Sequence, residues 1–206
     1  MTKIITFITI LVCGLLSAQT PYETGMAKGL SLWLEGKNTE AVATFERIAS
    51  VEKDNWLPNY YVALVNTLAS FETKDKQKAK SMLEVAQTAL DVEVEKDSKN
   101  AELLVVQGLI YTGWIMIDPM TNGMKYSGYA NSIYTKAAKI APENPRVLFC
   151  KAEFEMGSAK YFGQDTTPMC EQIAKSIPLF ENDKPETPFH PNWGLERAKE
   201  VSADCN

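Results

Sequence analysis

The fold is decided by residues 101–114, AELLVVQGLIYTGW. Leu104, Gly108 and Tyr111 fall at positions i, i+4 and i+7, which lie on one face of a helix. A glycine within such a face lets a second helix approach closely, because it has no side chain to hold the neighbour away. The stretch therefore predicts a helix that packs tightly against a partner helix.

That partner is expected in residues 128–146, GYANSIYTKAAKIAPENPR. Ala130, Tyr134 and Ala137 share one helical face, and Pro142 marks the end of the helix. The small residues indicate where the two helices cross, and the aromatic rings fill the space beside them. We therefore expect Gly108 to face the helix of Ala130 and Ala137.

Weaker copies of this hairpin flank it on both sides. Residues 22–52 and 56–97 each read as two helices, with breaks at 36–38 and 74–76, and a fourth hairpin begins at Pro145. The second helices of the four hairpins are anchored at Ala41, Ala79, Ala130 and Cys170. The predicted fold is all-α, with almost no strand.

A closing helix is expected near the C-terminus. Pro191 and Asn192 look like its start signal, and Trp193, Ala198 and Val201 would form its inward face. This helix would cap the array of hairpins.

The largest irregularity is an insertion at residues 117–129, inside the third hairpin. It contains Asp118, Pro119, Gly123 and Gly128, which are residues typical of turns. The insertion is therefore expected to be a structured loop rather than more helix.

The two helices of the third hairpin together resemble the tetratricopeptide repeat (TPR). In that repeat the first helix carries large, small and aromatic residues, and the second carries Ala, an aromatic residue, Ala and then Pro. The resemblance implies an α-α superhelix whose first helices line a concave surface for a protein or peptide. The chain also resembles small exported TPR-like proteins of the Bacteroidota envelope. The shared features are SAQ at 17–19, NPR at 144–146 and PNWG at 191–194. This narrower resemblance implies an envelope protein.

Residues 1–18, MTKIITFITILVCGLLSA, have the layout of a secretory signal peptide: a cation, an apolar run and small residues at the end. We expect cleavage after Ala18 and export to the periplasm or beyond. The remaining residues, 19–206, would form a single helical-repeat domain without stable membrane insertion, because charges interrupt every later apolar stretch.

Three cysteines follow the predicted signal peptide, and an exported compartment permits disulfides. Cys170 shares a helical face with Ile173, and Cys205 follows Val201 by four positions, so both would point inward. We predict a Cys170–Cys205 bond, with Cys150 as a buried free thiol. A Cys150–Cys170 pairing is the alternative.

The sequence offers little catalytic chemistry. The net charge of −5 provides no electrostatic footprint for nucleic acid. Glycine-rich phosphate loops, HExxH and GxSxG motifs are absent from the sequence, and its single histidine, His190, lies in a proline-rich turn. We therefore expect a protein that is not an enzyme, with no catalytic residues, no metal and no cofactor.

Binding is the positive hypothesis. The repeat register predicts a concave surface that would contact a protein or peptide partner. Its residues would be Met26, Trp33, Val105, Leu109, Phe149 and Met156. At helical spacing the same residues are also typical of a core. The main reading is a non-catalytic interaction module or adaptor in the bacterial envelope.

The alternative is an accessory protein that binds a small ligand or glycan for an outer-membrane nutrient-uptake system. It would require a compact aromatic cleft beside the insertion, formed by Trp114, Tyr126 and Tyr129.

Overall fold

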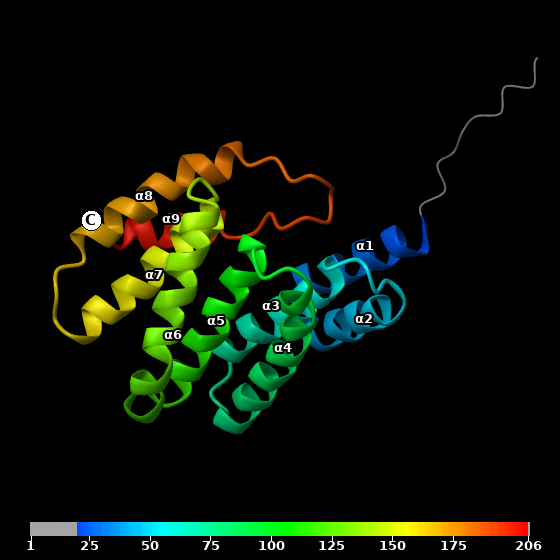
Figure 1. Cartoon of the computed structure of the whole chain (residues 1–206), viewed down its shortest axis with the longest axis horizontal. Coiled ribbons are helices and arrows are strands. Elements are labelled where there is room, and N and C mark those ends of the chain that lie inside the picture. The colour runs from blue at the N-terminus through cyan, green and yellow to red at the C-terminus, as the bar shows by residue number, and fades with distance from the viewer. Residues whose placement is uncertain (1–19, 206) are drawn as a thin grey trace, which may run out of the picture.

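The computed structural model describes residues 20–205, which form nine α-helices and no strand (Figure 1). The predicted signal peptide, residues 1–18, lies outside the described residues. The helices are α1 (Pro21–Leu34), α2 (Asn38–Val51), α3 (Leu57–Glu72), α4 (Lys76–Lys96), α5 (Ala101–Ile117), α6 (Pro119–Ile140), α7 (Pro145–Tyr161), α8 (Thr167–Asn182) and α9 (Leu195–Ala203). The predicted all-α class is confirmed.

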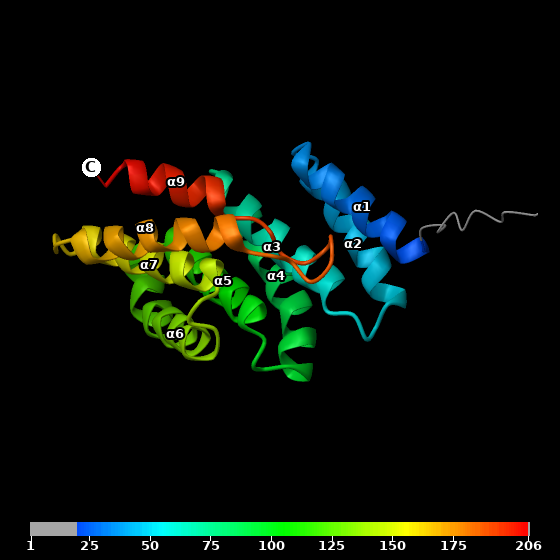
Figure 2. The ribbon, with the colours of Figure 1, turned by 90° about the horizontal axis from the view of Figure 1, so that it is seen from above.

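The first eight helices form four antiparallel hairpins, α1–α2, α3–α4, α5–α6 and α7–α8, which stack side by side along the molecule (Figures 1 and 2). Helix α9 lies against α8 at the C-terminal end of the stack. The core is continuous through the stack, because each hairpin buries its apolar faces against the next. This is the predicted helical-repeat arrangement.

The prediction that residues 117–129 form a loop was wrong, because α6 begins at Pro119 and continues through the insertion. Asp118 caps this helix by accepting a hydrogen bond from the Thr121 amide. Proline is well suited to the first helical position, where no N–H donor is needed. Gly123 and Gly128 cost the helix about 1 kcal/mol each relative to alanine, which packing of the neighbouring turns can offset.

The start of the closing helix was also predicted wrongly. Helix α9 begins at Leu195, after Gly194, whose φ of 112° is a backbone conformation that favours glycine. Ala198 and Val201 are buried as predicted. Pro191 and Asn192 belong instead to the extended segment 183–194, here called the strap, which connects α8 to α9.

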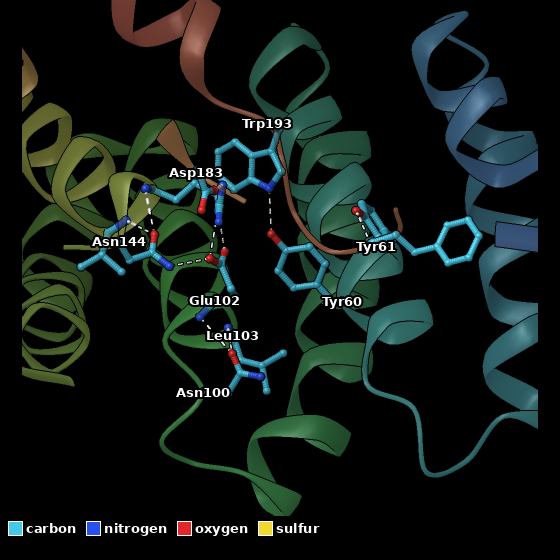
Figure 3. Close-up of polar contacts among 11 residues, drawn as sticks. Tyr60, Tyr61, Asn100, Glu102, Leu103, Asn144, Asp183 and Trp193 are labelled. Atoms are coloured by element: carbon cyan, nitrogen blue, oxygen red, sulfur yellow. Dashed lines mark hydrogen bonds and ion pairs between the residues drawn. The ribbon is translucent and has the colours of Figure 1, made fainter. Parts of the chain in front are cut away.

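The strap runs back from α8 across the stack to α3 and α1 (Figure 1). The Trp193 indole N–H donates to the Tyr60 hydroxyl at 2.7 Å, and the Tyr61 hydroxyl donates to the Phe189 carbonyl oxygen at 2.9 Å (Figure 3). Phe189 also packs edge-on against the ring of Tyr22 in α1. The strap thereby joins the last hairpin to the first two.

A buried arginine holds the near end of the strap. Arg146, which is 5% exposed, donates from Nε to both carboxylate oxygens of Glu102 at 2.9 Å, and from Nη1 to Asp183 at 2.8 Å. Burial alone would lower the pKa of Arg146, but the neighbouring carboxylates, Glu102 foremost, outweigh burial and raise it. The guanidinium therefore remains charged and links α5, α7 and the strap.

Helix capping places the Arg146–Glu102 pair. Asn100 and Asn144 each accept hydrogen bonds from the amides two and three residues on, which sets Glu102 in the first turn of α5 and Arg146 in the first turn of α7. The Asn144 amide also donates to Glu102 at 2.6 Å (Figure 3). Two similar caps thus bring opposite charges together at the same end of neighbouring hairpins.

The predicted Cys170–Cys205 disulfide is present and joins α8 to the residues after α9, with the two Cα atoms 5.8 Å apart. Cys150 is the buried free thiol, also as predicted. Burial raises the pKa of the Cys150 thiol well above its ordinary value, so the thiolate form is disfavoured. The bond fastens α9, a short terminal helix, to the stack.

The close crossing predicted at Gly108 is confirmed. A Cβ atom at this position would lie 2.4 Å from the nearest ring atom of Tyr134, on the helix that also carries Ala130 and Ala137. All three of these α6 residues are buried. Glycine is therefore required at position 108 because a larger side chain would collide with the Tyr134 ring, and not because of an unusual backbone conformation.

We predict that Gly108→Ala destabilises the protein by about 1–3 kcal/mol, because the added methyl group must displace the buried Tyr134 ring. Gly128→Ala is the matched control: it lies in α6, where a Cβ meets nothing within 4 Å. That control should be neutral or stabilise by up to about 1 kcal/mol. Thermal unfolding followed by circular dichroism compares them, and equal melting temperatures would contradict the assigned crossing.

We predict that Arg146→Met costs about 3–5 kcal/mol, because it leaves the Glu102 carboxylate buried without its cation. Arg197→Met is the control, since Arg197 pairs with Glu153 while its own side chain is 60% exposed. Exposed pairs contribute at most about 1 kcal/mol. Urea unfolding of both variants measures the difference, and a small effect at Arg146 would show that the buried pair is not what holds the strap.

Candidate functional site

An apolar groove of about 610 Å³ lies between α6 and α7. Its floor comes from the C-terminal half of α5, one wall from the N-terminal half of α6, and the other wall from the C-terminal half of α7. The large side chains that line it are Met116, Met120, Met124, Phe154, Tyr161 and Phe162. This site is called the groove below.

Most of these large side chains are exposed without stabilising the core. Met120 is 83% exposed and Met124 is 92% exposed, while Tyr161 and Phe162 on the facing wall are 68% and 69% exposed. Soluble proteins rarely leave contiguous apolar patches in water unless the patch binds something. Methionine and aromatic side chains suit an adaptable binding surface.

Two glycines keep the groove open. Gly123 on α6 and Gly157 on α7 both line it, and a Cβ atom at either position would meet nothing within 4 Å. By contrast, Gly108 and Gly113 are packed directly against side chains of neighbouring helices. The glycines of the groove thus lack a packing reason, and each costs its helix about 1 kcal/mol relative to alanine.

The groove is nearly free of charge. Of the residues that line it, Glu153 alone carries a formal charge, and its carboxylate is paired with Arg197 of α9 at 2.8 Å. Thr112 also lines the groove, but its hydroxyl donates to the Gly108 carbonyl at 2.9 Å. The site therefore favours a ligand with a large apolar surface.

The structure does bring together the aromatic residues predicted for a small-ligand cleft. Tyr126 stacks on Trp114, with ring centroids 5.9 Å apart, and on Tyr111 at 5.8 Å, while Tyr129 lies against both tyrosines. Asn122 fixes this end of α6 by donating to the Trp114 carbonyl at 2.7 Å. The rings pack on one another, and the groove is lined by other residues; a ligand at the aromatic cluster stays a prediction.

The residues predicted to contact a protein partner lie mostly in the core. Met26 and Val105 are fully buried, and Leu109, Phe149 and Met156 are no more than 7% exposed. The sixth, Trp33, is partly buried and packs edge-on against Tyr61. This is the pattern of core residues at helical spacing, and partner binding through them remains untested.

The groove itself was missed from the sequence. Met116, Met120 and Met124 recur every fourth residue, a periodicity typical of one helical face. Met120 and Met124 fall within residues 117–129, the segment predicted to be a loop, so their helical spacing was not recognised. Phe154 and Gly157 on α7 are likewise three residues apart, but only the tertiary structure places them opposite α6.

Residues 20–205 contain neither a candidate metal site nor a candidate membrane-spanning helix. No cluster of three or more His, Cys, Asp or Glu side chains in this range could hold a metal ion. None of the helices in the same range is long and apolar enough to cross a membrane.

Comparison with known proteins identifies the fold but not a family. No model of a protein family matches the chain, and no curated protein matches it in sequence. Among solved structures, it is similar to the HusA haemophore from Porphyromonas gingivalis, with a TM-score of 0.80 over 91% of this chain and 94% of that one. Sequence identity is 20%, so the likeness establishes a shared all-helical fold alone.

Proposed function

We propose that this chain is an exported haem-binding protein, a haemophore-like accessory of a nutrient-uptake system, and that it holds haem in the groove. The observation that carries the proposal is an open apolar groove, walled by exposed methionine and aromatic side chains, on a fold shared with a haemophore. It belongs to the same class as the small-ligand alternative predicted from the sequence, although that alternative placed the ligand at Trp114, Tyr126 and Tyr129 rather than in the groove. The interaction-module reading has weaker support, because five of its six predicted contact residues are buried.

The chemistry of the groove suits haem. A volume of about 610 Å³ lies within the usual range for small-molecule sites. The porphyrin is flat and apolar on both faces, which matches walls of methionine on α6 and aromatic rings on α7. Its carboxylate groups would face solvent, since the charged residue of the groove is the acidic Glu153.

Export belongs to the same proposal. The signal-peptide pattern of residues 1–18 supports it, and so does the Cys170–Cys205 disulfide, because such bonds persist in oxidising compartments outside the cytosol. We also propose that the hairpins are of the TPR type, on the small–aromatic pattern of Gly108, Ala130 and Tyr134.

The proposal predicts that filling the groove abolishes haem binding without unfolding the protein. Gly123→Leu combined with Gly157→Leu adds a large side chain to each wall, where a Cβ meets open space. Haem affinity, measured by titration of the Soret absorption band, should fall by about tenfold or more, equivalent to about 1.4 kcal/mol. The melting temperature should not decrease, because leucine is a better helix former than glycine.

Gly128→Leu is the matched control. It adds the same side chain to α6 at a position that also faces open space but does not line the groove. Haem affinity should stay at the wild-type value in this variant. Undiminished binding by the double variant, or no haem binding by the wild-type protein, would refute the proposal.

A further inference from the structure

The methionines of the groove carry an inference that rests on the proposed function and deepens it. We propose that haem iron is ligated in the groove by a methionine thioether of α6, from Met120 or Met124. The cargo would then be recognised through its iron as well as through its porphyrin faces.

Few side chains serve as axial ligands of haem iron: histidine, cysteine thiolate, methionine and tyrosine. His190, the single histidine, lies in the strap, where its ring packs against Trp56, the residue before α3, and its Nδ1 is 2.8 Å from the Thr187 hydroxyl. Cys170 and Cys205 form a disulfide. Cys150 is buried, with a pKa raised by burial. The groove therefore offers methionine and tyrosine.

Tyrosine fits the groove less well than methionine. Tyrosine ligates iron strongly as the phenolate anion, which needs a nearby cation or donor to stabilise it. The charged residue that lines the groove is Glu153, an acid, and the guanidinium of Arg197 is already engaged with it. A thioether is neutral at every pH, so an apolar, nearly uncharged groove does not oppose it.

The placement of the α6 methionines gives the second observation. Met120 and Met124 are one helical turn apart on the same face of α6, and both line the groove. At 83% and 92% exposed, neither stabilises the core. Leucine would provide similar apolar area and helix propensity at these positions, so what methionine adds, besides a more flexible side chain, is a soft sulfur donor.

Thioether ligation has a consequence for the redox state of the cargo. A soft, neutral donor favours ferrous over ferric iron, and methionine ligation raises the reduction potential of haem. Haem in the wild-type groove should thus have a higher potential than haem in the same groove without sulfur. Apolar contact alone would give no such difference.

The test replaces both sulfurs with Met120→Leu and Met124→Leu in one variant. The thioether-to-iron charge-transfer band of bound ferric haem should disappear, and ferrous haem affinity should fall by about tenfold, equivalent to about 1.4 kcal/mol. Affinity for metal-free protoporphyrin should change by less than about twofold, since the apolar walls remain. Met82→Leu on α4, outside the groove, is the control and should leave the spectrum unchanged.

The outcomes separate this inference from the proposed function. A wild-type ferric spectrum without this band, or a band that persists in the double variant, would overturn ligation by an α6 methionine while leaving haem binding intact. If wild-type protein binds neither haem nor metal-free protoporphyrin, both the inference and the proposed function fall.

Discussion

The buried ion pair of Arg146 is the constraint on which the rest of the structure depends. The guanidinium is bonded to Glu102 at the start of α5 and to Asp183 at the start of the strap, so one side chain sets the positions of two hairpins and a connecting segment. Removing a charge from such a site leaves its partner buried and unpaired. The third hairpin, the fourth hairpin and the strap are therefore coupled.

The strap in turn covers part of the surface of the hairpin array. An array of helical hairpins ordinarily presents a concave surface lined by its first helices. Here the strap contributes Phe189 and Trp193 to contacts with Tyr61 and Tyr60 of α3, so part of that surface is occupied by the chain itself. The open apolar groove lies elsewhere, between the second helix of one hairpin and the first helix of the next, α6 and α7.

Features that depend on the helical pattern of residues close together in the sequence were predicted, and features that depend only on contacts between distant residues were not. The Gly108 crossing and the Cys170–Cys205 bond were predictable because helical periodicity places their side chains on definite faces. The strap was not, because its contacts join residues 128 and 133 positions apart, and no local pattern encodes them. The first turns of α6 were missed for a different reason: Asp118 and Pro119 signal a helix start as well as a turn.

The glycines show why the same residue type gave one correct prediction and one missed site. At Gly108 the neighbouring ring of Tyr134 fills the space that a side chain would need, so the glycine is part of a packing pattern with a helical period. At Gly123 and Gly157 the space beside the backbone is empty. A glycine that a neighbour requires can be predicted from the helical pattern of that neighbour, whereas the open space at Gly123 and Gly157 depends on how α6 and α7 are placed in the fold. The groove therefore had to be found from the structure, which places the end of α7 opposite the first turns of α6.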